Sequence, residues 1–180
     1  MTDRSYFAPR GGHPPQTQLL TGRAIFTEAY AVIPAGTMQD IVTSFLPFWD
    51  KTRAWILARP LSGFAETFSQ KIMELAPGGG SDRPEPDPEA QGVLFAVEGE
   101  LTVSIGGSDH VLSPGGYAYL PPSCGWTAHN RGTAPARFHW IRKRYEKVDG
   151  LDMPDPVFTS DADVAPTPMP GTEGKWATTR

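Results

Sequence analysis

Residues 92–107 read "GVLFAVEGELTVSIGG", and this stretch decides the fold class. Two apolar runs, residues 93–97 and residues 101–105, flank a short turn centred on Gly99. Glycine adopts the positive φ that a tight hairpin turn requires, because it has no Cβ. The stretch therefore predicts two β-strands that pair across this turn, as in a small all-β sandwich or barrel.

The surrounding sequence also consists of short segments typical of β-strands. Short segments rich in β-branched and aromatic residues, each closed by Pro or Gly, fill residues 23–148, and none sustains a helical period over more than about ten residues. The 19 glycines and 19 prolines agree with many turns between short strands. We expect an N-terminal arm at residues 1–22, an all-β barrel at residues 23–148, and a linker rich in Pro and Asp at residues 149–180.

Composition argues against several classes of partner. The net charge is −4 and charged residues make up 20% of the chain, so bulk charge gives no basis for binding nucleic acid or an anionic membrane. No apolar run approaches the ~18 residues of a membrane helix, and the N-terminus lacks the apolar core of a signal peptide. A cytoplasmic protein is expected. The single cysteine, Cys124, excludes an internal disulfide.

Two longer stretches resemble the paired motifs of the cupins, which are small jelly-roll barrels also called double-stranded β-helices. They are "PGGGSDRPEPDPEAQGVLFAVEGEL" at residues 77–101 and "LSPGGYAYLPPSCGWTAHN" at residues 112–130. Cupins with a metal hold it with two histidines and a glutamate from the first motif and a histidine from the second. Aligned on Gly99 and Pro121, those positions fall on Glu85, Asp87, Gly92 and Trp126, or on Pro86 and Pro88 for the first two under a shorter spacing.

These replacements predict a barrel without metal and without catalytic residues of its own. A first-row divalent metal needs nitrogen and carboxylate donors at ~2.0–2.2 Å. Gly92 offers no donor, and the indole of Trp126 can only donate a hydrogen bond and would fill the space of the ion. We expect Glu85 and Asp87 to lie in a solvated acidic loop. An unorthodox acidic metal site built from these two carboxylates is the weaker alternative.

The histidines do not replace the lost ligands. His129 lies three residues from Trp126, so on a strand the two side chains point to opposite faces. We expect His110 in a turn and His13 in the N-terminal arm. Cys124 is expected as a small packed side chain rather than a nucleophile, because no histidine sits at a motif position that would make it a base.

Two other groups receive structural interpretations. The basic run from Arg142 to Lys147 is expected to be the solvated face of an edge strand, paired with local acidic residues, with an anion site as the less favoured alternative. The tryptophans are expected in the core or at a domain contact rather than in a stacking platform for nucleic acid. They are Trp49, Trp55, Trp126, Trp140 and Trp176.

The flanking segments narrow the resemblance. The stretches at residues 22–60 and 137–151, the latter reading "RFHWIRKRYEKVDGL", are similar to the N-terminal half of (S)-ureidoglycine aminohydrolase. That family of two-cupin enzymes acts in purine (allantoin) breakdown and hydrolyses ureidoglycine to ureidoglycolate and ammonia. The similarity covers about residues 22–160. It implies that this chain is the metal-free half, inactive alone, and that manganese belongs to a second cupin not contained in these residues.

The same resemblance implies partners. The chain would pack against the second cupin of the same protein and take part in a homo-oligomer. The alternative is a stand-alone, metal-free cupin that binds a small ligand in its barrel. Its pocket would lie under Trp126, with Tyr119 and Phe95 in the wall.

Overall fold

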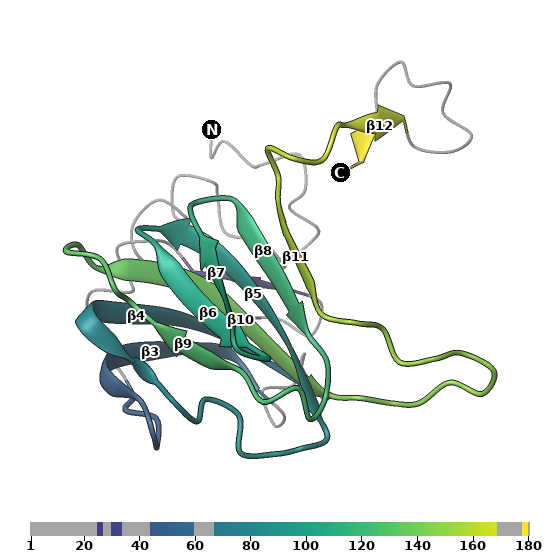
Figure 1. Ribbon diagram of the computed structural model, residues 1–180, viewed down its shortest axis with the longest axis horizontal. Coiled ribbons are helices and arrows are strands. Elements are labelled where there is room, and N and C mark those ends of the chain that lie inside the picture. Colours follow the sequence, from purple (N-terminus) through teal and green to yellow (C-terminus); the bar gives the residue numbers. More distant parts are fainter. Residues whose placement is uncertain (1–24, 27–29, 34–43, 60–66, 169–177, 180) are drawn as a thin grey trace, which may run out of the picture.

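The computed structural model describes residues 25–26, 30–33, 44–59, 67–168 and 178–179 (Figure 1). All regular structure in these residues is β, as the sequence predicts, and none of them forms a helix. The N-terminal arm with His13 and the residue Trp176 lie outside the described residues. The strands are β1 (Ile25–Phe26), β2 (Ala31–Val32), β3 (Asp50–Ala58), β4 (Phe68–Ser81), β5 (Ala90–Glu98), β6 (Leu101–Ile105), β7 (Ser108–Leu112), β8 (Gly116–Leu120), β9 (Thr127–His129), β10 (Ala136–Arg144), β11 (Val157–Ser160), β12 (Thr167–Pro168) and β13 (Thr178–Thr179).

Nine strands form one strongly curved antiparallel sheet. Its order is β11-β8-β5-β10-β4-β9-β6-β7, and β3 pairs with β4 beside this path. The sheet curls on itself into the barrel seen in Figure 1. The bend depends on β4, whose first part pairs with β3 and β10 and whose last residues, Gly80 and Ser81, pair with β9. At Gly80 a Cβ would come within 2.2 Å of the Ala128 carbonyl oxygen, so only glycine allows this close approach.

The strands β5 and β6 form where the sequence predicts them, but the predicted pairing between them is wrong. β5 pairs with β8 and β10, whereas β6 pairs with β7 and β9. Gly99 has a φ of 69° and sits where a Cβ would lie 2.3 Å from the Pro135 carbonyl oxygen. The turn at Gly99 therefore carries the chain from one side of the barrel to the other. The tight hairpin lies one turn later, at Gly106 and Gly107 between β6 and β7, where both residues have positive φ.

Alternate residues of the strands build the core. The burial pattern of β5, from Ala90 to Glu98, has period two at its buried positions, and β8 and β10 repeat it. The interior side chains are almost all apolar. They include Met73, Leu75, Leu94, Ala96, Leu101, Val103, Ala118, Leu120, Phe138 and Trp140. The barrel interior is thus a packed core.

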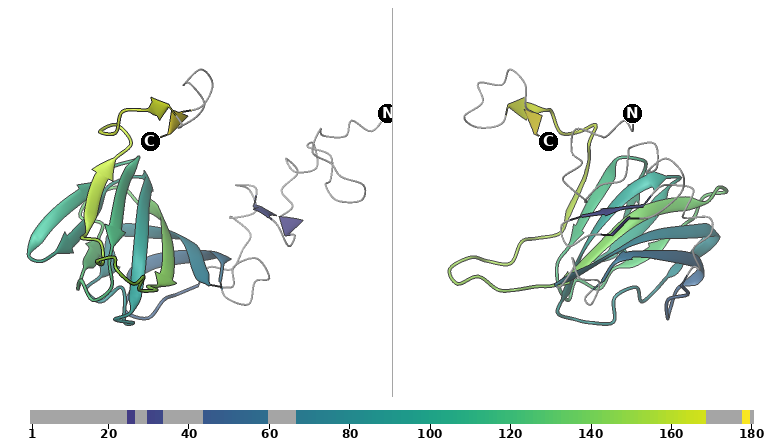
Figure 2. Two further views of the ribbon diagram at one scale, coloured as in Figure 1. Left: turned by 90° about the vertical axis from the view of Figure 1, so that its right-hand side faces the viewer. Right: turned by 180° about the vertical axis from the view of Figure 1, so that it is seen from behind.

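Part of the predicted linker belongs to the sheet. The strand β11, at residues 157–160, pairs antiparallel with β8. Phe158 of β11 stacks on His110, with ring centroids 3.7 Å apart. His110 itself lies in β7, so its predicted place in a turn is wrong. Beyond β11, the short pair β12–β13 stands away from the barrel, as Figure 2 shows. Within the described residues, no helix has the length and apolar character needed to span a bilayer.

Candidate functional site

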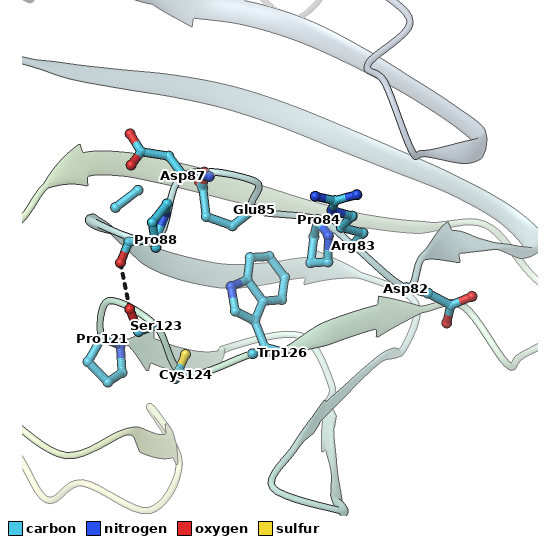
Figure 3. A pocket seen from close by; sticks show the side chains of 12 residues that line it. Asp82, Arg83, Pro84, Glu85, Asp87, Pro88, Pro121, Ser123, Cys124 and Trp126 are labelled. Carbon is cyan, nitrogen blue, oxygen red and sulfur yellow. Dashed lines mark hydrogen bonds between the residues drawn. The ribbon is translucent and has the colours of Figure 1, made fainter.

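Two loops form one end of the barrel: residues 82–89, which precede β5, and residues 121–126, which connect β8 to β9. A cavity of about 180 Å³ lies between them (Figure 3). The Ser123 hydroxyl donates a hydrogen bond of 2.9 Å to the Pro88 carbonyl oxygen and ties the loops together. Three of the four positions that a metal-binding cupin would use border this cavity, namely Glu85, Asp87 and Trp126.

Glu85 is held by an arginine and is not free in a solvated loop, so that expectation is wrong for this residue. Its side chain is only 10% exposed. The Arg142 guanidinium donates to both carboxylate oxygens, at 2.5 and 2.8 Å, and the Asp87 backbone N–H donates to Oε1 at 2.8 Å. This hydrogen bonding with Glu85 raises the pKa of Arg142. These three hydrogen bonds occupy most of the acceptor sites of the Glu85 carboxylate, so little of it is left to bind another group.

Asp87 is held in a similar way. Its carboxylate accepts hydrogen bonds from the Glu89 backbone N–H at 3.1 Å, from Arg144 at 3.1 Å and from Arg142 at 3.2 Å. The Glu89 N–H and then Arg144 hold the pKa of Asp87 below its usual value. In Figure 3 the carboxylate points away from Trp126. Asp87 therefore anchors the loop.

These arginines also correct the expectation for the basic run at residues 142–147. Its first three residues end β10, which pairs with β4 on one side and β5 on the other and is not an edge strand. Arg142 occupies an inward position directly opposite Gly92 of β5. The pairing with acidic residues is present, but it reaches 57 residues back along the chain to Glu85.

Gly92 makes room for a tryptophan. A Cβ at this position would lie 3.3 Å from the Nε1 atom of Trp140. Trp140 is 3% exposed, and its Nε1 is buried without a hydrogen-bond partner among the described residues. The indole thus occupies space that a side chain at position 92 would need. A glutamate could not be restored here without displacing Trp140.

Trp126 completes the filling of the barrel end. It is 7% exposed and packs edge-to-face on Trp140, with ring centroids 5.9 Å apart. Trp49 approaches Trp140 from another direction, at 5.6 Å between centroids. Three indoles therefore pack against one another, and one of them, Trp126, stands at a position where the resemblance would place a metal ligand. Such aromatic contacts stabilise the core beyond simple burial.

Lys71 is the residue that the sequence analysis missed. It lies in β4 on the same inward face as Met73 and directly opposite Trp140 of β10. Its ammonium lies 4.4 Å from the centroid of the Trp140 ring and donates to the Ser69 hydroxyl at 3.3 Å. Burial, and then the positive charge of Arg142, lower the pKa of Lys71 to about 8. In the sequence, the only indication was that Lys71 lies two residues before Met73, so that on a strand the two side chains share a face.

The residues at the cupin ligand positions do not fit a metal ion. Glu85 and Asp87 are bound to arginines, Gly92 has no donor, and Trp126 has only an N–H. The described residues contain no group of three or more His, Cys, Asp or Glu side chains arranged to hold a metal. Two cationic groups, Lys71 and Arg142, also lie near this end of the barrel, and they would repel a metal cation.

The other candidate residues lie apart from this end of the barrel or play structural roles. Phe95 is 41% exposed on the outer face of β5, between the buried Leu94 and Ala96. Tyr119 is on the outer face of β8 and donates a hydrogen bond of 2.9 Å to Gln91. Neither joins Trp126 in a pocket, because strand alternation turns both outward.

His129 and Cys124 agree with their sequence interpretations. The His129 ring lies 3.4 Å from the Asp82 carboxylate, at a position out of phase with the buried Trp126 and Ala128. Cys124 packs against the core, and burial raises the pKa of its thiol, so it stays protonated at neutral pH. Within the described residues the tryptophans are buried, as expected: Trp49, Trp55, Trp126 and Trp140.

Comparison with known proteins agrees with this geometry. Residues 71–142 match the family model described as a cupin domain, Cupin_2. The fold is that of the cupins, an all-β barrel. The match begins at Lys71 in β4 and ends at Arg142 in β10, so it contains both loops around the cavity.

Longer relatives extend the similarity beyond the cupin domain. The (S)-ureidoglycine aminohydrolase of Escherichia coli (strain K12) is 27% identical over 133 residues, which are 73% of this chain and 49% of that protein. A crystal structure of a protein described as glyoxylate induced, from Pseudomonas aeruginosa, is 58% identical with a TM-score of 0.77 and covers 94% of this chain and 61% of its own. The protein Ylba from E. coli is 25% identical with a TM-score of 0.73, covering 84% of this chain and 60% of its own. The chain spans about half the length of the curated relative.

Proposed function

We propose that this chain is the non-metal cupin half of a two-cupin protein with (S)-ureidoglycine aminohydrolase activity, and that its role is structural. The observation that carries the proposal is the occupied barrel end, where Trp126 and Trp140 fill the space of a metal centre. The similarity to the E. coli aminohydrolase supports the choice of reaction, and its coverage of 49% of that enzyme leaves room for a second domain. The chemistry would then belong to the second cupin, with manganese as its metal.

The outer face of the barrel supports a packed partner. On the strands β5 and β10, Phe95, Val97 and Ile141 are exposed, although the outward face of an antiparallel sheet is usually polar. Phe95 and Ile141 lie in neighbouring cross-strand rows, since Phe95 pairs with His139 and Ile141 with Val93. A second cupin domain or a second copy of the protein would cover these side chains and remove them from water.

Metal content and activity test the proposal. The 180-residue chain and a chain extended to the natural stop codon are purified with Mn²⁺ and compared for bound manganese and for ammonia release from (S)-ureidoglycine. We expect metal and activity only in the extended chain. Stoichiometric manganese in the short chain would contradict the proposal. So would a gene that ends at Arg180 without encoding a second cupin.

A surface variant tests the partner. Phe95→Ser in the extended chain is expected to lower the oligomeric state measured by light scattering, because it removes an exposed aromatic side chain from the proposed interface. Val111→Ser, on the edge strand β7, is the matched control, since Val111 is exposed at 59% away from that face. Equal effects of both variants would argue against the outer face of β5 and β10.

A further inference from the structure

A lysine without an acidic partner lies on the inner face of the barrel. Lys71 is on the inward side of β4, two residues before the fully buried Met73 and directly opposite Trp140 of β10. None of the described residues forms an ion pair with it. Lys143, by contrast, pairs with Glu146 at 3.3 Å. An ammonium group removed from water normally has a carboxylate beside it, so this unpaired one is a candidate for chemistry.

Two contacts fix the position of the amine. Its Nζ atom lies 4.4 Å from the centroid of the Trp140 ring and donates a hydrogen bond of 3.3 Å to the Ser69 hydroxyl. Ser69 in turn pairs across the strands with Arg142. The amine therefore sits between an aromatic face and a second cation. Ser69, Lys71 and Arg142 are all partly exposed, so solvent touches this part of the barrel end.

These surroundings favour the neutral amine. Burial, and then the charge of Arg142, lower the pKa of Lys71 to about 8. The charge of Glu85 acts in the opposite direction, but that carboxylate is already bound to Arg142. Burial beside another cation is one of the ways in which proteins make a lysine nucleophilic. At pH 7.5 about a quarter of an amine of pKa about 8 is unprotonated, against about 0.1% of an ordinary lysine.

An unprotonated amine attacks the carbon of a carbonyl group. A C–N bond forms first, and the carbonyl oxygen takes up a proton and becomes a hydroxyl group. Loss of this hydroxyl as water then leaves a C=N bond, the imine. The two amine protons leave with the carbonyl oxygen, so the reaction balances with water as its only by-product. It consumes no oxidant and no reductant.

The Trp140 ring favours a carbonyl compound over the other electrophiles that react with amines. A protonated imine keeps one positive charge on the nitrogen and so keeps its contact with the ring face. Reaction with CO₂ would place an anionic carbamate against the negative face of the ring. Acylation would leave a neutral amide. Both of these products lose the cation–π contact that the lysine makes now.

We propose that Lys71 is a nucleophilic amine that condenses reversibly with small aldehydes and ketones, and that the resulting imine is held against the Trp140 ring. This covalent binding activity goes beyond the structural role proposed above and does not depend on it. The carbonyl compound must be small, because the neighbouring inward side chains Met73 and Trp140 are 0% and 3% exposed and leave no room between them.

Reductive trapping in the 180-residue chain tests the proposal, with propionaldehyde and sodium cyanoborohydride at pH 7.5. The reductant converts each imine into a stable propyl-lysine, which peptide mass spectrometry locates. Lys147, at an exposed position, is the internal control. We expect Lys71 to be labelled about ten-fold faster than Lys147, because its larger supply of free amine is partly offset by lower nucleophilicity and restricted access. In urea-unfolded protein the two rates should converge.

The pH dependence tests the cause of the reactivity. The ratio of the two labelling rates within one sample cancels the pH dependence of the reductant. We expect this ratio to be constant below about pH 8 and to fall above it, as an ordinary lysine also loses its proton. Arg142→Gln removes the neighbouring cation and frees the Glu85 carboxylate, and both changes should slow the labelling of Lys71 several-fold without changing that of Lys147.

The outcomes that contradict the proposal are distinct. Equal labelling of Lys71 and Lys147 in the folded, unmodified chain would overturn the nucleophile, and this comparison needs no variant. Unchanged labelling of Lys71 in a folded Arg142→Gln chain would overturn the role given to Arg142. A carbamate on Lys71 in ¹³C-bicarbonate, detected by ¹³C NMR, together with no trapping of propionaldehyde, would overturn the choice of a carbonyl compound. None of these measurements involves manganese or ammonia release, so they are independent of the tests of the proposed function.

Discussion

Replacement of Lys71 by methionine should stabilise the protein at neutral pH. The ammonium is half-buried on the Trp140 ring, and its pKa falls from 10.5 to about 8. At about 1.36 kcal/mol for each unit of pKa, that lowering corresponds to roughly 3 kcal/mol against the charged form in the folded protein. Methionine keeps the length of the side chain and a favourable sulfur contact with the ring. It loses a cation–π contact worth about 1 kcal/mol. We therefore expect the free energy of unfolding to rise by about 1–2 kcal/mol.

The pH dependence of the stability gain in Lys71→Met distinguishes removal of a buried charge from better packing of the side chain. Between pH 8 and pH 10.5 the unfolded chain binds more protons at Lys71 than the folded chain does, so the contribution of Lys71 to the free energy of unfolding rises with pH in this window. Lys71→Met lacks that rise, and its advantage should shrink steadily above about pH 8. Urea unfolding from about pH 7 to pH 10 measures the difference. Lys147→Met, at an exposed position, is the control and should give a flat difference. A difference for Lys71→Met that stays constant over this range would refute the burial argument.

Four other substitutions, one of them a control, test the ion pairs and the filled barrel end. Glu74→Gln should cost about 1–2 kcal/mol at neutral pH. Burial raises the pKa of Glu74, but hydrogen bonds from its two arginines outweigh burial and lower it, so in urea unfolding the cost should begin to fall below about pH 4.5 and be lost once the pH is below the lowered pKa of the folded state. Arg142→Met leaves a buried carboxylate unpaired and should cost roughly 2 kcal/mol, whereas Arg144→Met, at a side chain 68% exposed, should stay within about 0.5 kcal/mol by thermal denaturation. Gly92→Ala should cost about 1–2 kcal/mol, since the new methyl group presses on the wedged Trp140 indole, and a neutral result would show that the ring can move.

The sequence predicted the positions of the strands better than it predicted which strands pair with each other. The apolar runs on either side of Gly99 are strands at the predicted residues, because strand formation follows local alternation and turn residues. Their expected hairpin is absent, because a jelly-roll turn can cross between the two sides of a barrel with the same glycine that a hairpin would use. Local pattern does not distinguish the two turns, since the difference lies in what each strand meets at long range.

The candidate site likewise has some features that were predictable from the sequence and others that depend on contacts between distant residues. The replacement of ligands at Gly92 and Trp126 is visible in the sequence, because motif spacing alone places those residues at the metal positions. The interpretation of Glu85 as a solvated loop residue failed, since its partner is Arg142 on a strand formed much later in the chain. Lys71 was missed for the same reason: only the pairing of β4 with β10 sets it on a tryptophan ring.

By itself, the sequence determined the all-β class, the turns that need glycine, and the loss of metal-binding side chains at two of the cupin ligand positions, Gly92 and Trp126. These properties depend on residue type and short spacing, which the chain carries locally. The tertiary structure decided which strands pair, which carboxylates are buried with arginines, and which indole N–H is buried without an acceptor. These depend on contacts between distant segments, whose geometry exists only once the barrel has curled on itself.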